Sequence, residues 1–303
     1  MASEEMQATI AFVKEMLAQG FGATFDANLD PVKLRNAVEP AQAAMPIEEG
    51  VTLKEETLGG IYAELAVPEG ARDDALIIYL HGGGLVCGNA MTSRGYTSML
   101  AKESKIPTYA FSYRLAPENP YPAPLDDCVT AYEEILKKHP EKSLFLIGES
   151  GGALLCVAAA LRIRDAGLKM PAGIIPYSVV MDFSNTIDRI RPETDDFNIT
   201  PGGLDALANF YCPDESMRKD PYCSPYFADD FTKMPPALLG WDKAELLAAD
   251  NEYLVQKLTE AGIEVHYKAY EGCFHAFSTT GTGTPESYEL LKDTIAFIES
   301  HIK

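Results

Sequence analysis

Short, mostly apolar segments alternate with stretches of helical periodicity from residue 75 onward, and this alternation restricts the fold more than any other feature of the sequence. The apolar segments are 75–80, 107–113, 143–148, 172–180, 236–241 and 263–270. The helical stretches between them are about 92–104, 124–139, 151–166, 245–261 and 286–302. Strands that are apolar along their length need cover on both faces, as in parallel sheets. The pattern therefore predicts an α/β fold.

The chain before residue 75 follows different patterns. Apolar residues at helical spacing predict a helix over 5–19, and a second helix is expected to begin near Pro31. Residues 51–58 and 61–68 alternate apolar and polar side chains on either side of a glycine pair. This alternation predicts a hairpin of two exposed strands.

A segment between residues 182 and 234 interrupts the alternation of strands and helices. It is rich in Pro, Asp and aromatic residues and is roughly fifty residues long, whereas connections usually have about 4 to 6 residues. A helix is predicted near 201–211. Long insertions of this kind are often lids or binding walls, so we expect it to lie over one end of the sheet. Acidic pairs such as Asp195-Asp196 are predicted to be solvated surface.

The charge balance excludes some classes of partner. The chain has 303 residues, with 25 Lys and Arg against 45 Asp and Glu, and a formal net charge of −20. Phosphate backbones and anionic membrane surfaces would be repelled, so we expect no nucleic-acid binding and no stable membrane association. The hydrophobic share of 47% is typical of a globular protein and argues against disorder.

Six cysteines are scattered along the chain, and none forms a CxxC pair. We therefore predict neither a metal site nor a disulfide framework. The N-terminal residues are acidic rather than basic, and no apolar run approaches the ~18 residues that a membrane-spanning helix needs. These observations predict a cytoplasmic protein.

The pentapeptide Gly148-Glu149-Ser150-Gly151-Gly152 satisfies the pattern G-x-S-x-G. An apolar segment leads directly into it and a helical stretch leaves it, which is the strand, sharp turn and helix that a nucleophile elbow requires. The glycines relieve crowding at a strained serine. Ser150 is therefore the candidate nucleophile, although an ordinary glycine-rich turn is the simpler alternative.

A second glycine motif, His81-Gly82-Gly83-Gly84, follows the segment 75–80. Backbone N–H groups without a neighbouring Cβ can approach a ligand oxygen, as in an oxyanion hole. Gly83 and Gly84 would supply two donors and Gly151 a third. A phosphate-binding loop is the rival interpretation, but the motif lacks the Lys-Ser/Thr ending of a P-loop.

A serine hydroxyl needs a base to take its proton. His275 lies in the segment GCFHAF after the last predicted strand, where the chain order serine, acid, histidine expects the base. The other four histidines lie in less suitable positions, namely His81, His139, His266 and His301. The acid should follow the segment 236–241. Asp242, Glu245 and Asp250 all satisfy this condition, and the pattern alone does not separate them.

Four ordered motifs resemble those of the hormone-sensitive-lipase-like family of α/β-hydrolase carboxylesterases. They are HGGG at 81–84, YRLAPENPYPAPLDD at 113–127, GESGG at 148–152 and YEGCFHAF at 270–277. The resemblance covers about residues 50–303. It implies an eight-stranded, mostly parallel sheet with a helical cap, and hydrolysis of short-chain esters without a cofactor. The cap would comprise N-terminal helices in 1–48 and an insertion at about 183–232, within a core of 49–303.

The resemblance also implies the roles of the site residues. Ser150 would be the nucleophile, His275 the base, and Gly83, Gly84 and Gly151 the oxyanion hole. The family's acid is normally the aspartate of a D-P-L segment, about nine residues after a Pro-Pro-Ala-Leu strand begins. This spacing falls on Glu245, which Leu246-Leu247 follows in place of Pro-Leu. The resemblance therefore favours Glu245, with Asp242 as the alternative acid.

Two further departures concern the walls of the site. Leu85 follows HGGG where the family usually has an aromatic residue, and Gly151 follows the serine where alanine is usual. Both differences should reshape the acyl and alcohol pockets.

The motifs and the resemblance together predict a serine carboxylesterase for small-molecule esters from acetyl to about hexanoyl. Two alternatives stay open: an amidase or deacetylase with the same triad, and a non-catalytic ligand receptor. The sequence also leaves a homodimer open.

Overall fold

The computed structural model describes residues 2–19 and 24–303. Its centre is one eight-stranded sheet with the order β1-β2-β4-β3-β5-β6-β7-β8. The strands are β1 (Val51–Leu58), β2 (Ile61–Pro68), β3 (Ala75–Leu80), β4 (Thr108–Phe111), β5 (Ser143–Glu149), β6 (Gly173–Tyr177), β7 (Ala237–Asp242) and β8 (Val265–Tyr270). β2 pairs antiparallel with β1 and β4, and the remaining pairs are parallel. The mostly parallel eight-stranded α/β fold is thus confirmed.

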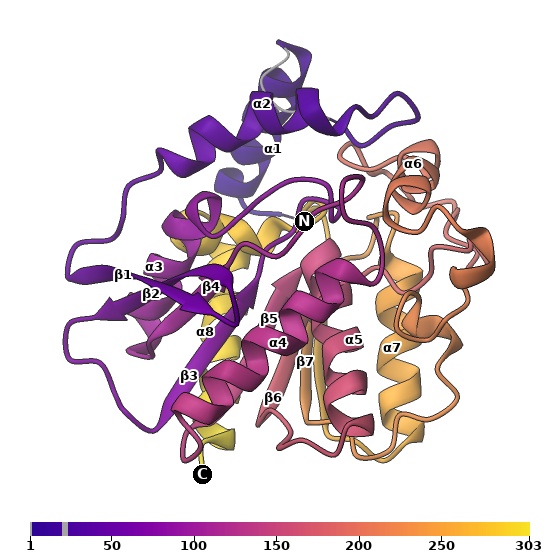
Figure 1. The fold of residues 1–303 in the computed structure, drawn as a ribbon. Helices are drawn as coiled ribbons and strands as arrows, with labels where there is room; N and C mark the ends of the chain where they lie inside the picture. The colour runs from indigo at the N-terminus through magenta and orange to yellow at the C-terminus, as the bar shows by residue number, and fades with distance from the viewer. Residues whose placement is uncertain (1, 20–23) are drawn as a thin grey trace.

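Helices cover both faces of the sheet (Figure 1). The helices are α1 (Glu4–Ala18), α2 (Pro31–Ala43), α3 (Arg94–Ser104), α4 (Ala123–Lys138), α5 (Gly151–Asp165), α6 (Pro201–Tyr211), α7 (Ala248–Glu260) and α8 (Pro285–His301). The central strands are buried on both sides because their side chains alternate between two apolar cores. In β3, Leu76 and Ile78 pack in the core that contains α4 and α5. Ala75 and Ile77 pack in the core that contains α3 and α8.

One predicted helix begins later than its sequence pattern indicated. The stretch 245–261 is helical only from Ala248, and Glu245 lies in the loop between β7 and α7. The side chain of Asp242 causes the difference, because its Oδ1 accepts a hydrogen bond from Ala244 N at 2.9 Å and turns the chain as it leaves the strand. Glu245 is thereby placed at the carboxyl end of the sheet instead of inside a helix.

The two N-terminal helices and α6 of the long insertion gather beyond the carboxyl ends of the parallel strands (Figure 1). Main-chain hydrogen bonds join the two regions, from Phe25 N to Asn198 O at 2.8 Å and from Thr200 N to Phe25 O at 2.9 Å. Functional sites of α/β sheets lie at this end of the strands. Within the described residues, no helix is both long and apolar enough to span a membrane.

Candidate active site

Ser150 lies at the sharp turn between β5 and α5. Its φ of 55° and ψ of −120° are strained for a residue with a side chain. Two neighbouring glycines make the turn sterically feasible. A Cβ at position 148 would lie 2.4 Å from the carbonyl oxygen of Gly152, and a Cβ at position 152 would lie 2.0 Å from that of Leu80. The local sequence therefore forces the serine into an elbow at the end of a buried strand.

His275 meets the serine from the loop that follows β8. Its Nε2 lies 2.9 Å from the Ser150 Oγ, which is hydrogen-bond distance. Both side chains are buried. The backbone N–H of Ala276 donates to the Ser178 Oγ at 3.2 Å, so a residue at the end of β6 holds the histidine loop. The structure thus brings together two predicted residues that are 125 positions apart in the chain.

Glu245 is the carboxylate beside the histidine. Its Oε2 lies 3.6 Å from the His275 Nδ1, which is beyond hydrogen-bond distance but close enough for a direct electrostatic interaction. The same oxygen accepts a hydrogen bond from the Ser178 Oγ at 2.8 Å. Ser178 therefore contacts both the acid and the histidine loop. Sequence reasoning missed it, and its only signal was its position directly after a parallel strand.

The other two candidate acids bind elsewhere. Asp242 accepts hydrogen bonds from Ala244 N at 2.9 Å and from Cys273 N at 2.7 Å, so it joins the acid loop to the histidine loop through their main chains. Asp250 forms a buried ion pair with Arg189, with an Oδ2 to Nε distance of 2.7 Å. Of the three carboxylates, Glu245 is the one whose ion-pair contact is with the imidazole of His275.

Buried charges shift the pKa values of this pair. Burial opposes the charged form of His275, but the carboxylate of Glu245, with Asp196 and Glu149 farther away, outweighs that effect and raises the pKa of His275 above its ordinary 6.5. Burial also raises the pKa of Glu245, an effect that the neighbouring imidazole opposes. The arrangement favours an imidazolium once the histidine has accepted a proton.

The glycine loop after β3 lies against the elbow. The carbonyl oxygen of Gly83 accepts hydrogen bonds from Val86 N and Cys87 N, both at 3.1 Å, which closes the loop into a tight turn. Gly83 and Gly84 have φ values of 97° and 62°, which favour glycine. A Cβ on Gly151 would lie 3.0 Å from Leu85 N, so the three predicted oxyanion glycines come from two main-chain segments in close approach.

Glu149, inside the pentapeptide motif, connects the elbow to the glycine loop. Its Oε1 accepts a hydrogen bond from Gly82 N at 2.5 Å, while its Oε2 has no hydrogen-bond partner among the described residues. Burial raises its pKa to about 7. Sequence reasoning assigned no role to this residue, since the motif accepts any side chain at its position.

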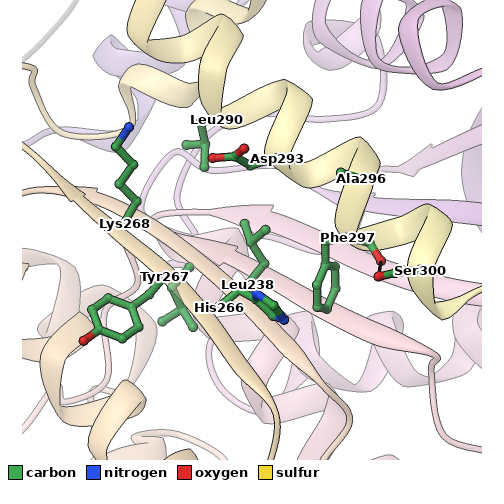
Figure 2. Close-up of a pocket in the computed structure, with 10 residues that line it drawn as sticks. Leu238, His266, Tyr267, Lys268, Leu290, Asp293, Ala296, Phe297 and Ser300 are labelled. Atoms are coloured by element: carbon green, nitrogen blue, oxygen red, sulfur yellow. Dashed lines mark hydrogen bonds between the residues drawn. The ribbon is translucent and has the colours of Figure 1, made fainter.

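A surface pocket of about 460 Å³ lies away from these residues, between β8 and α8 (Figure 2). It is lined by Leu238, Leu239, His266, Tyr267, Lys268, Leu290, Asp293, Ala296, Phe297 and Ser300. None of the candidate catalytic residues lines it. In the part of the chain that the structure describes, no group of three or more His, Cys, Asp or Glu side chains could hold a metal ion.

Comparison with known proteins agrees with the fold described above. A family model described as an alpha/beta hydrolase fold matches residues 77–279. The chain is 28% identical over 291 residues to an esterase of Acinetobacter venetianus, covering 95% of each chain. It is 30% identical over 250 residues to an acetyl-hydrolase of Streptomyces hygroscopicus, covering 80% of this chain and 81% of the relative. The crystal structure of a hormone-sensitive lipase from a metagenome library superposes with a TM-score of 0.89, at 30% identity and 100% coverage of both chains.

The chain therefore belongs to the α/β-hydrolase fold family. Within that family it is a carboxylesterase of the hormone-sensitive-lipase-like type, which confirms the resemblance inferred from its four motifs.

Proposed function

We propose that this carboxylesterase hydrolyses short-chain esters of small molecules through an acyl-enzyme on Ser150. The observation that carries the proposal is the 2.9 Å contact between the Ser150 Oγ and the His275 Nε2 at a strained elbow. His275 takes the hydroxyl proton as the oxygen attacks the ester carbonyl. Glu245 stabilises the imidazolium that results. Asp242 is not the proposed acid, because backbone N–H groups already occupy both its oxygens.

The negative oxygen of the tetrahedral intermediate would be bound by the backbone N–H groups of Gly83, Gly84 and Gly151. The last of these is the first residue of α5, where N–H groups have no partner within the helix. The imidazolium then protonates the departing alcohol, and a water molecule, deprotonated by His275, releases the acyl group. One oxyanion donor of this kind typically contributes about 10²–10³ in turnover.

We also propose that α1, α2 and the insertion at about 183–232 form a cap over this site. The approach of Phe25 and Leu207 to the glycine loop supports it, because a Cβ on Gly84 would lie 3.0 Å from Phe25 Cε1 and 2.6 Å from Leu207 Cδ2. An apolar cover this close to the oxyanion glycines would suit small acyl groups, from acetyl to about hexanoyl. Activity that rises steadily with longer p-nitrophenyl acyl chains would contradict this preference.

A reducing, cytoplasmic location is supported by six buried cysteines, all of them unpaired. A homodimer is supported by the edge strand β8, whose Tyr267 is 60% exposed, because an edge strand offers unpaired main-chain groups to a second copy. Light scattering after size exclusion would contradict the dimer if it gave the mass of one chain at all concentrations.

The central test is Ser150→Ala. Ser300→Ala is the control, because Ser300 is an exposed serine on α8 and lines the surface pocket away from the candidate site. Loss of the nucleophile should lower kcat for p-nitrophenyl acetate by about 10⁶, and the control should keep wild-type activity. A fluorophosphonate should label Ser150 in the wild-type protein. Substantial esterase activity in the Ser150 variant would overturn the proposed nucleophile.

The same assays separate the two alternatives. Turnover on matched ester and amide substrates distinguishes an esterase from an amidase, since the fold and the triad serve both reactions. Binding of esters without turnover, together with no labelling of Ser150, would indicate a receptor instead.

A further inference from the structure

A short part of the insertion, residues 195–200, contacts the loop that carries Glu245. Asp195 N donates to the Ala244 carbonyl oxygen at 2.9 Å. The Oδ2 of Asp196 accepts a hydrogen bond from Leu246 N, also at 2.9 Å. Glu245 is therefore held between two main-chain groups, one on each side, that bond to consecutive residues of the insertion.

The other carboxylate oxygen of Asp196 stabilises the turn that its own segment forms. Its Oδ1 accepts hydrogen bonds from Asn198 N at 2.9 Å and from Ile199 N at 3.0 Å. One carboxylate thus accepts three backbone N–H groups, two from its own segment and one from the acid loop. Such a bridge needs two acceptor oxygens facing in different directions, which an aspartate supplies and an asparagine does not.

The same segment also contacts the histidine loop and α1. The ring of Phe197 lies 5.9 Å from that of Phe274, the residue before His275. The Nζ of Lys14 lies 4.7 Å from the Phe197 ring centroid, within the range of a cation–π interaction. Residues 195–200 therefore contact the loops that carry both the acid and the base.

We propose that Asp196 is a positioning residue, whose carboxylate fixes the main chain of the Glu245 loop and thereby sets the distance between Glu245 and His275. The role rests on the proposed function, because it acts on the acid and the base of that mechanism. The D-P-L segment of the related family has proline at the position of Leu246, and proline has no N–H with which to form this bond. In this chain Leu246 N donates to Asp196, and this hydrogen bond restrains a loop that lacks the proline.

Because Asp196 is charged, its removal should change the pH dependence of the reaction, which the loss of a merely structural residue would not do. Three carboxylates act on His275 and raise its pKa, namely Glu245 from the acid loop, Asp196 from the insertion and Glu149 from the elbow. Removal of any one of them should lower that pKa. The acid limb of kcat/KM, which reports the free-enzyme histidine, should then move to lower pH.

The first experiment compares Asp196→Asn with Asp188→Asn, which removes the same charge from an exposed position in the insertion. Asparagine at 196 cannot accept from both sides, so kcat per active site should fall about tenfold or more, with KM less affected, and the acid limb should shift to lower pH. Asp188→Asn should leave kcat and the acid limb unchanged. Sites are counted by fluorophosphonate titration. Wild-type kcat in Asp196→Asn would overturn the proposal.

A second variant, Asp196→Glu, separates geometry from charge and serves also if Asp196→Asn does not fold. It keeps the negative charge but moves the carboxylate by one methylene, so the oxygens no longer match the three backbone N–H groups of the turn and the acid loop. Asp196→Glu should lower kcat per titrated site with the acid limb unchanged, and Asp188→Glu is the matched control at an exposed position. Wild-type kcat in Asp196→Glu would overturn the positioning role.

Failure of this proposal is distinguishable from failure of the proposed function. If Ser150→Ala abolishes hydrolysis while the variants at 196 keep wild-type kcat, the nucleophile stands and Asp196 has no positioning role. If Ser150→Ala retains hydrolysis, the proposed mechanism itself is wrong.

Discussion

The two halves of the candidate site are built in different ways. On the nucleophile side, Ser150 and the glycine loop are held by the main chain, and a Cβ at position 83, 148 or 152 would lie within 3 Å of a backbone atom. On the acid and base side, Glu245 and His275 lie on loops that are held by hydrogen bonds to the side chains of Ser178, Asp196 and Asp242. The first half is rigid by sterics, whereas the second depends on polar contacts between segments distant in sequence.

The two halves should therefore respond differently to mutation. A change at a crowded glycine should disturb the fold and the activity together, because a steric conflict with backbone leaves little freedom to relax. A change at Glu245 should alter activity more than folding, because the charge that stabilises the imidazolium acts mainly during the reaction.

A comparison of Glu245→Gln with Asp242→Asn tests this contrast and has the largest expected effect on kcat. Loss of the charge beside His275 should lower kcat by about 10³–10⁴ while the protein stays folded. Asp242→Asn replaces one acceptor oxygen by an NH2 group, so one of the two backbone N–H groups loses its acceptor, and we expect about 1–3 kcal/mol of lost stability with a smaller loss of kcat. Steady-state kinetics and urea unfolding measure both effects. A larger loss of kcat in Asp242→Asn would reverse the assignment of the acid.

Gly152→Ala tests the nucleophile side, with Gly283→Ala as the control because the nearest atom to a Cβ there is 4.0 Å away. Alanine inside a helix normally gains roughly 0.5–1 kcal/mol over glycine. At position 152 the conflict with the Leu80 carbonyl oxygen should outweigh this gain and cost about 1–3 kcal/mol, with activity lost in parallel. Thermal unfolding measures the change. An unchanged or raised melting temperature would show that the elbow is less rigid than its sterics indicate.

The pH profile gives the smallest expected effect. The base must be neutral to accept a proton, and protonation below its pKa removes activity. Because the carboxylates raise the pKa of His275 above 6.5, the acid limb of kcat/KM should have its midpoint above pH 6.5. In Glu245→Gln the residual activity should extend to lower pH. An acid limb below pH 6.5 in the wild-type protein would show that burial dominates over the carboxylates.

The nucleophile side was predictable because its requirements are local. A strained turn needs small residues at fixed spacing next to a strand and a helix, so GESGG and HGGG indicate the arrangement by themselves. Chain order and elimination identified His275 as the candidate base. The acid was different, because Asp242, Glu245 and Asp250 all follow the same strand. Which of them faces the imidazole depends on a turn that ends the strand and delays α7 to Ala248.

Asp196 illustrates what sequence patterns leave out. Its acidic pair was predicted to be solvated surface, and Asp195 is indeed exposed. Asp196, in contrast, is half-buried and accepts three backbone N–H groups. Two of those donors lie in its own turn, but Leu246 N belongs to a loop fifty residues further along the chain. No local pattern distinguishes the two neighbouring aspartates.

The amino-acid sequence by itself determined the fold class, the strained serine and the glycine loop, because alternating apolar segments and glycines at fixed spacing beside a strand can be recognised in short stretches of sequence. The tertiary structure alone decided which carboxylate faces His275 and which part of the insertion supports it. Those choices depend on where loops from β6, β7 and β8 meet, and electrostatic contacts of a few ångströms exist only after the sheet has brought the loops together.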